Sequence, residues 1–206
     1  MILEIDPIEP EPWLLARAVQ VLRAGGIAVI PTDTVYGIAC GITHTDAIRR
    51  IYALKNMDPK KPLAILVGDM GMIGRYAKGI STPSFRLMKR VLPGPYTFIF
   101  DASPEVPKIM LRKRRTIGVR MPDDPIVLAL LEELSEPLLS TSIQGANHDY
   151  VNDPEEIERS LGDGVDLVVD GGVLLPVPST VVDLSGDRTE LIRIGKGDVD
   201  ALELFD

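Results

Sequence analysis

The feature that most constrains the fold is the alternation of two hydrophobic patterns along the chain. Apolar residues recur at helical spacing in segments such as Pro12 to Leu22, and short continuous apolar runs such as Ile27 to Ile30 lie between these segments. A period of about 3.6 residues is typical of amphipathic helices, whereas short apolar runs bounded by turn residues are typical of buried strands. Helices and strands in alternation favour a sheet flanked by helices over a helical bundle or a β-sandwich.

Helix starts are marked by capping residues and prolines. One helix is expected from Pro12 to the Gly25-Gly26 pair, and Thr45 is expected to cap a second helix that ends at Lys55. Three cap-then-proline pairs predict further helices, at Thr82-Pro83, Asp124-Pro125 and Asp153-Pro154. Buried strands are expected at residues 27–30, 63–67, 96–100, 116–120, 138–141, 165–169, 180–184 and 190–194. The last two strands lie close together in sequence, which favours antiparallel pairing, so we predict a mixed α/β sheet in a single domain over residues 1–206.

The sequence lacks the marks of membrane, disulfide-bonded and zinc proteins. Its longest apolar runs fall far short of the roughly 20 residues that a transmembrane helix needs, and its acidic start, MILEIDPIEPEP, is unlike a signal peptide. A single cysteine, Cys40, rules out an intrachain disulfide framework, and one Cys with two His is too few for a structural zinc site. We therefore expect a cytoplasmic protein without metal ligands of its own.

Charge is divided unevenly along the chain. Residues 1–120 hold 18 Lys and Arg against 10 Asp and Glu, whereas residues 121–206 hold 4 against 20. Clustered positive charge raises the local concentration of anions, so the first portion is expected to hold an anionic ligand. Mutual attraction of the two portions across one domain is the alternative explanation.

The polar step Thr32-Asp33-Thr34 interrupts the apolar stretch Ile27 to Gly41. A hydroxyl-rich break between two buried strands commonly lines a pocket, although simple capping of strand ends is the other interpretation. The sequence contains no GxxxxGK[ST], GxGxxG or GxSxG motif, so any nucleotide must be bound by a different arrangement of residues. Hydroxyls and cations near predicted element ends remain as candidates to hold phosphates and a carboxylate without covalent chemistry. They are Thr32, Lys55, Lys61, Thr97, Arg120, Ser142, Ser179 and Arg193.

Seven sequence blocks follow one another in a recognisable order. They are PTDTVYG at 31–37, Lys55-Asn56 followed by Lys61-Pro62-Leu63, PGPYTFIF at 93–100, VRMPDDP at 119–125, PLLSTS at 137–142, VDLVVDGG at 165–172 and PSTVVDL at 178–184. In this order they resemble the YrdC/YciO-like family. The resemblance covers nearly the whole chain, from about residue 5 to Arg193. It implies a twisted open α/β sheet with a concave, positively charged face.

The best-known members of this family are threonylcarbamoyl-AMP synthases, which use L-threonine, bicarbonate and ATP, commonly with Mg²⁺, in the modification of tRNA. The resemblance implies threonine contacts from Thr32, Arg120 and Ser179, with Arg120 pairing with the carboxylate. It implies nucleotide contacts from Lys55, Lys61, Thr97, Ser142 and Arg193. The implied reaction is mostly positioning and charge stabilisation, and no residue need act as a nucleophile. Partner proteins of the tRNA modification pathway are implied as well.

The sequence departs from the synthase signature at two positions. Where the family has Lys-x-Arg and Ser-x-Asn, this chain has Lys55-Asn56-Met57 and Ser142-Ile143-Gln144. A thioether in place of a guanidinium removes a charge and up to five donors. Loss of one charge-assisted bond to a triphosphate costs about 1.5 to 3 kcal/mol. The pattern is closer to the YciO branch, which predicts weak synthase activity or a different substrate.

A second hypothesis is a double-stranded or structured RNA-binding protein without synthase activity. Its candidate phosphate contacts are the consecutive residues Arg112, Lys113, Arg114 and Arg115. Aromatic residues make up only 5% of the chain, which disfavours single-strand binding by base stacking. A solvated loop is the alternative role for this run.

Overall fold

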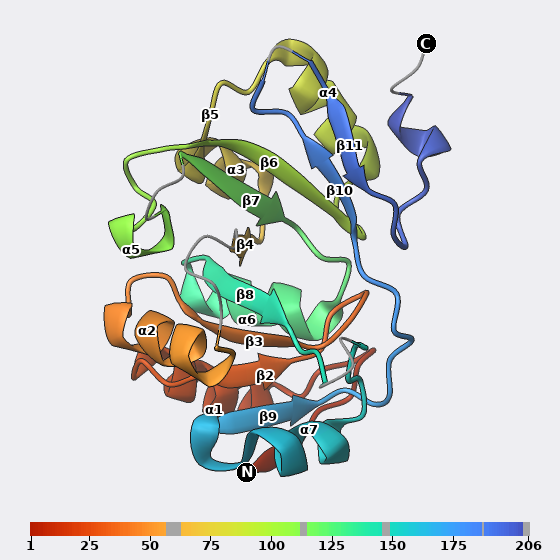
Figure 1. The fold of residues 1–206 in the computed structure, drawn as a ribbon. Helices are drawn as coiled ribbons and strands as arrows, with labels where there is room; N and C mark the ends of the chain where they lie inside the picture. The colour runs from red at the N-terminus through yellow and green to blue at the C-terminus, as the bar shows by residue number, and fades with distance from the viewer. Residues whose placement is uncertain (57–62, 112–114, 146–148, 187, 204–206) are drawn as a thin grey trace.

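The computed structural model describes residues 1–56, 63–111, 115–145, 149–186 and 188–203. These residues form one eleven-stranded mixed sheet that is twisted and open, with helices packed against it (Figure 1). The predicted class, an α/β sheet with flanking helices, is confirmed. Within the described ranges, no helix is both long and apolar enough to cross a membrane.

The predicted strands all occur, each within two residues of its expected bounds. The strands are β1 (Ile2–Glu4), β2 (Ala28–Ile30), β3 (Gly37–Gly41), β4 (Ala64–Leu66), β5 (Ala77–Lys78), β6 (Tyr96–Ala102), β7 (Thr116–Arg120), β8 (Leu138–Ser142), β9 (Leu167–Asp170), β10 (Thr180–Asp183) and β11 (Glu190–Arg193). Their order in the sheet is β1-β9-β2-β3-β8-β4-β7-β6-β10-β11, and β5 pairs with β6. The antiparallel pairing of β10 with β11 confirms the expectation for the last two strands.

The helices are α1 (Pro12–Arg23), α2 (Thr45–Leu54), α3 (Met70–Tyr76), α4 (Thr82–Val91), α5 (Lys108–Leu111), α6 (Pro125–Leu134) and α7 (Pro154–Leu161), followed by the short 3-10 helices η1 (Gly162–Gly164) and η2 (Asp200–Leu202). Four helices, α1, α4, α6 and α7, begin at or next to the predicted prolines, and α3 and α5 were not predicted. Asp124 caps α6 by accepting a hydrogen bond from the backbone N–H of Val127 at 2.9 Å. Asp153 caps α7 in the same way.

Two capping predictions were wrong by one residue. Thr45 is the first residue of α2, and the N-cap is His44, whose side chain makes no capping hydrogen bond. Thr82 is likewise the first residue of α4, and Ser81 is its cap, accepting from the N–H of Ser84 at 3.2 Å. Pro83 lacks an N–H and its fixed φ suits the first helical turn, so the helix starts one residue before it and the cap moves to Ser81.

Alternate side chains of the central strands pack into two separate cores. In the segment leading through β2, Ile27 and Val29 join one hydrophobic cluster, whereas Ala28 and Ile30 join the other. The second cluster is covered by α1 and α6, and the first by α2 and α7, with α3, α4 and α5 extending it toward the β6 end of the sheet (Figure 1). Both faces of the central strands are therefore buried, as continuous apolar runs predict.

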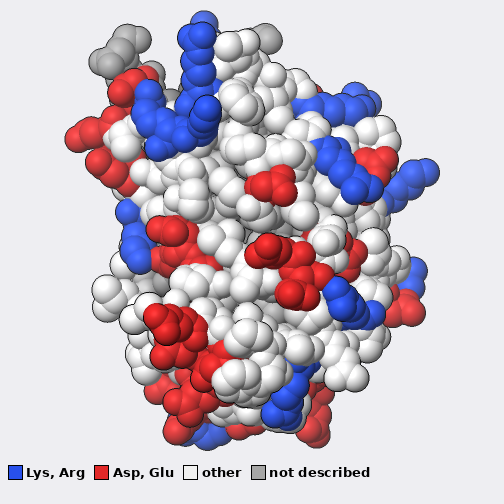
Figure 2. All heavy atoms as spheres, turned by 180° about the vertical axis from the view of Figure 1, so that it is seen from behind, with Lys and Arg blue, Asp and Glu red and all other residues white. Residues whose placement is uncertain are grey.

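Charged side chains are separated on the face seen from behind. Figure 2 shows Lys and Arg mainly in the upper part of this face, and Asp and Glu mainly across its middle and lower parts. The upper part of the molecule holds α4, and the lower part holds α1 (Figure 1). On this face, most of the basic side chains therefore lie at the end of the sheet opposite α1.

Candidate active site

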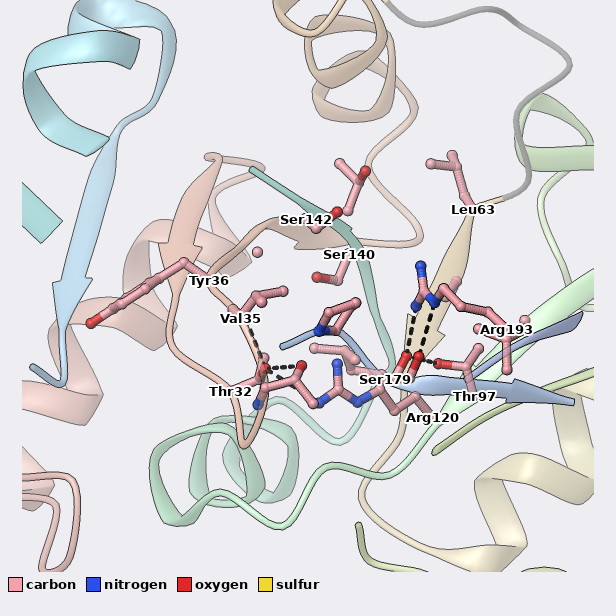
Figure 3. Close-up of a pocket in the computed structure, with 18 of the residues that line it drawn as sticks. Thr32, Val35, Tyr36, Leu63, Thr97, Arg120, Ser140, Ser142, Ser179 and Arg193 are labelled. Carbon is pink, nitrogen blue, oxygen red and sulfur yellow. Dashed lines mark hydrogen bonds between the residues drawn. The ribbon is translucent and has the colours of Figure 1, made fainter. Parts of the chain in front are cut away.

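A pocket of about 260 Å³ lies on one face of the sheet, where strands from both halves of the chain meet (Figure 3). Its walls are rich in hydroxyl groups, from Thr32, Thr34, Thr97, Ser140, Thr141, Ser142 and Ser179. Among the described residues, its lining cations are Arg120 and Arg193, and no carboxylate lines it. Such a site is suited to anionic ligands, because hydroxyls and guanidinium groups donate hydrogen bonds to carboxylate and phosphate oxygens.

The floor of the pocket is a row of small side chains across adjacent strands. Ser140 of β8, Ala64 of β4 and Gly118 of β7 are register partners and therefore point to the same face. A Cβ on Gly118 would lie 3.2 Å from the Cβ of Ala64, so even one added methyl would crowd this floor. The next residues on this face, Leu66 and Leu138, belong to the cluster that α6 covers. The pocket therefore opens next to the part of this face that α6 covers, where the side chains on the sheet become small.

Arg120 reaches the pocket from the end of β7 as part of a buried ion pair. Its Nη2 donates to the Oδ1 of Asp33 and, at 3.3 Å, to the Oγ1 of Thr32. Burial lowers the pKa of Arg120, and the adjacent Asp33 carboxylate opposes that effect. Because a guanidinium keeps its proton in proteins, the pair is an ionic one.

Thr32 both stabilises its own turn and lines the pocket. Its Oγ1 accepts from the N–H of Thr34 at 3.1 Å and donates to the carbonyl of Val35 at 2.8 Å. It is only 2% exposed. Both interpretations of this hydroxyl, local capping and pocket lining, therefore apply to Thr32.

Arg193 is held against the opposite wall by Ser179. Its Nε donates to the carbonyl of Ser179 at 3.0 Å, and its Nη2 donates to the Ser179 hydroxyl at 3.2 Å. That hydroxyl also lies 2.9 Å from the Oγ1 of Thr97, as Figure 3 shows. Within the described ranges Arg193 forms no ion pair, unlike Arg120. Its positive charge is therefore the less compensated of the two lining arginines.

Lys55 lies just behind the wall formed by β8. It follows the last residue of α2, and its Nζ donates to the carbonyl of Ser142 and, at 3.3 Å, to the Oγ1 of Thr141. The structure therefore brings Lys55 and Ser142 together, as expected for two residues of one site. Gln144, two residues beyond, forms an isolated antiparallel bridge with Tyr150, which also lines the pocket.

The pocket brings together six of the eight predicted site residues directly. These are Thr32, Thr97, Arg120, Ser142, Ser179 and Arg193. Lys61 and Met57 lie outside the described residues, as do Arg112, Lys113 and Arg114 of the basic run. Arg115, the described member of that run, lines a separate hollow with Lys78 and Lys108.

Two residues of the site were missed from the sequence. Asp33 lay within the recognised PTDTVYG block, and its position between two threonines was the available signal. Lys196 gave no signal, because its Nζ reaches back across 163 positions to donate to the backbone carbonyl of Asp33 at 2.5 Å. Such a contact follows from the return of the chain after β11 and not from any local pattern.

This fold and this pocket place the chain in a known family. The Sua5_yciO_yrdC family model, described as "Telomere recombination", matches residues 20–195, a span that contains every residue lining the pocket. The chain therefore belongs to the Sua5/YciO/YrdC family.

Particular relatives span nearly the whole chain. The uncharacterized protein YciO of Escherichia coli is 40% identical over 197 residues, which are 95% of each chain, and its crystal structure matches with a TM-score of 0.92 over 98% of each. The human threonylcarbamoyl-AMP synthase is 35% identical over 178 residues, which are 83% of this chain and 63% of the human one. P. abyssi Sua5 in complex with L-threonine matches with a TM-score of 0.92 at 27% identity, over 98% of this chain and 60% of Sua5.

Proposed function

We propose that this protein forms threonylcarbamoyl-AMP from L-threonine, bicarbonate and ATP, as an L-threonylcarbamoyladenylate synthase acting in tRNA modification. The observation that carries the proposal is the pocket itself, in which hydroxyls and two arginines converge and which no carboxylate of the described ranges lines. A substrate set with one carboxylate, one carbonate and three phosphates needs such donors. The relatives that bear the synthase name, and the Sua5 relative bound to L-threonine, support this choice.

The threonine end of the pocket would be formed by Thr32 and Arg120 on one wall and by Ser179 on the opposite wall. The amino acid carboxylate would accept a hydrogen bond from the Arg120 guanidinium, whose Nη1 has no partner within the described residues. The Ser179 hydroxyl, shared with Thr97 and Arg193, would face the same ligand from across the pocket.

The nucleotide end would be formed by Thr97, Ser142 and Arg193, with Lys55 behind the wall of β8. Lys61, which lies outside the described residues, is proposed as a further nucleotide contact. Lys55 and Arg193 supply charge, and the hydroxyls supply neutral donors. Since no carboxylate lines the pocket among the described residues, any Mg²⁺ would bind through the triphosphate and not through a protein ligand set.

The chemistry would need positioning more than acid–base catalysis. A carbamate oxygen of N-carboxythreonine would attack the α-phosphorus of ATP, and the bond from that phosphorus to the pyrophosphate oxygen would break. Arranging the reacting groups in a pocket lined by donors lowers the barrier through orientation and charge stabilisation. Partner proteins of the modification pathway and tRNA itself would act on the released intermediate.

The test is incubation of the protein with ATP, L-threonine and bicarbonate, followed by detection of pyrophosphate and threonylcarbamoyl-AMP by mass spectrometry. Omission of bicarbonate is the control for ATP hydrolysis. A Met57→Arg, Gln144→Asn double variant restores the synthase signature and should raise the yield by roughly tenfold or more, because each group can regain a bond to phosphate. Absence of the adenylate with both proteins would refute the proposal.

A further inference from the structure

The ion pair of Asp33 and Arg120 differs from every other ion pair in the described part of the chain. Each of its two side chains is 9% exposed. The other five pairs have side chains that are at least 40% exposed. Exposed pairs contribute little to stability, and a buried pair commonly gains too little to offset desolvation, so fixing an orientation is a better reason to retain one.

Asp33 lies beside the guanidinium of Arg120 and not in the pocket. Arg120 is a lining residue and Asp33 is not. The Nε of Arg120 and the Oδ2 of Asp33 are sealed from solvent, and neither has a partner among the described residues. Because Nη2 is occupied by Asp33 and Thr32, Nη1 is the nitrogen of this guanidinium that remains for a ligand.

Asp33 is itself held in place. The Thr32 hydroxyl closes the turn that carries it, and Lys196 donates to its backbone carbonyl at 2.5 Å. Asp124 is the other buried carboxylate whose charge acts on Arg120, but it is engaged in capping α6 and makes no ion pair in the described ranges. Asp124 therefore offers no substitute for the hydrogen bond that Asp33 accepts from Arg120.

We infer that Asp33 is a positioning residue, which fixes the Arg120 guanidinium so that Nη1 alone is presented to the carboxylate of the substrate. The inference rests on the proposed function, since the carboxylate to be recognised is that of threonine. It adds a specificity role: the fixed guanidinium should make the pocket discriminate a carboxylate from a neutral group at that position. An unrestrained guanidinium would rotate and lose that selectivity.

The orientation can be measured without substrate. In ¹⁵N NMR spectra of protein labelled at arginine, a fixed guanidinium gives separate Nη1 and Nη2 signals, and the spectrum of an Arg120→Lys variant assigns them. We expect separate signals for Arg120 in the wild type and a single averaged signal in Asp33→Asn, which keeps the side-chain shape but loses the charge. Separate signals that persist in Asp33→Asn would overturn the inference.

The selectivity is measured by calorimetric binding of L-threonine and of L-threoninol, in which an alcohol replaces the carboxylate. The wild type should prefer threonine by about tenfold or more, as expected for one charge-assisted hydrogen bond. Asp33→Asn should reduce that preference toward one. If the role of Asp33 were purely structural, Asp33→Asn would weaken the binding of both ligands equally and leave the ratio of their affinities unchanged. That result would also overturn the inference.

An exposed ion pair of the same chemistry provides the control. Asp46 accepts from Arg49 at 2.6 Å on α2, and Asp46→Asn should change neither the NMR signals of Arg120 nor the ligand preference. A wild type that binds neither threonine nor threoninol would refute the proposed function. In that case the NMR comparison still decides whether Asp33 positions Arg120.

Discussion

The hydroxyl of Tyr36 donates a hydrogen bond to the backbone carbonyl of Gly172 at 2.7 Å and accepts one from the N–H of Gly171 at 3.0 Å. Tyr36 is fully buried, and its own backbone N–H donates to the Oδ1 of Asn152 at 3.0 Å. The turn that enters β3 is thereby fastened to two segments more than a hundred positions away. Burial is the largest cause that raises the pKa of this phenol, so its proton is retained for the bond to Gly172.

Tyr36→Phe should lower the free energy of unfolding by about 1 to 2 kcal/mol, because the backbone groups of Gly171 and Gly172 lose their shared partner. Urea denaturation followed by circular dichroism measures the change. Tyr76→Phe is the matched control, since the Tyr76 ring is buried but its hydroxyl makes no hydrogen bond within the described residues. Equal losses in the two variants would contradict the prediction.

Cys40 should resist thiol reagents in the folded protein. Burial raises the pKa of its thiol to about 12, and the charge of Glu136 adds to that effect. We expect negligible reaction with a disulfide reagent in mildly alkaline buffer, and rapid reaction after addition of denaturing urea. Rapid labelling of the native protein would show that β3 opens easily.

The same raised pKa predicts an alkaline loss of stability. An unfolded thiol titrates near pH 8.5. The contribution of Cys40 to the free energy of unfolding is therefore constant below about pH 8.5 and falls by about 1.4 kcal/mol per pH unit above it. The loss should continue to about pH 12, where the folded thiol ionises. Denaturation curves of the wild type and Cys40→Ala across this range give the difference, and parallel pH profiles would contradict the assignment to this thiol.

Gly195→Ala should impair the pocket. A Cβ at this position would lie 2.3 Å from the carbonyl oxygen of Pro178 and 2.5 Å from the carbonyl carbon of Ser179, and backbone atoms cannot move aside as a side chain can. The segment carrying Ser179 and Arg193 must shift, and a misplacement of about 1 Å can cost on the order of a hundredfold in rate.

Adenylate formation and thermal denaturation together measure the effect of Gly195→Ala. Gly74→Ala on α3 is the control, because nothing lies within 4 Å of its added Cβ. It should be neutral or stabilise by up to about 1 kcal/mol through helix propensity. Full activity in Gly195→Ala would show that this wall tolerates movement.

Lys55→Met should weaken nucleotide binding by roughly tenfold to a hundredfold, the loss expected for one charge-assisted hydrogen bond to phosphate. Titration calorimetry with a non-hydrolysable ATP analogue measures the affinity. Lys89→Met on α4 removes the same charge from a residue that does not line the pocket, and it should have no effect. Comparable affinity in Lys55→Met and wild type would remove Lys55 from the nucleotide site.

The strands were predictable because apolar runs and their bounding turn residues are local signals. The order of the strands was not, since β1 pairs with β9 through partners such as Leu3 and Val169, which no local pattern connects. The caps of α2 and α4 were misplaced because Thr45 and Thr82 have the side chains of good caps, whereas the geometry of the first turn selects the preceding residue.

The site was predictable where residues fall in recognisable blocks, as Thr32 and Ser142 do. Asp33 was visible as a polar residue, but its partner was not, because β2, which precedes Asp33, and β7, which carries Arg120, are placed relative to each other only by the order of strands in the sheet. Lys196 was not predictable, since an isolated lysine after a strand is usually a solvated charge. Local chemistry thus predicts which groups are available, and the long-range topology decides which of them meet.

The row of small residues under the pocket has a consequence for how ligand size is set. Ser140, Ala64 and Gly118 are register partners on three neighbouring strands, and the larger Ile99 follows on the next strand. Neighbouring strands lie about 4.8 Å apart, so the row of small residues extends about 10 Å across the sheet. The strands are joined by backbone hydrogen bonds and cannot part to admit a longer molecule. The width available to a substrate is therefore fixed by the number of adjacent strands that carry a small side chain. A single substitution by a larger residue in this row would reduce that width by the spacing of one strand.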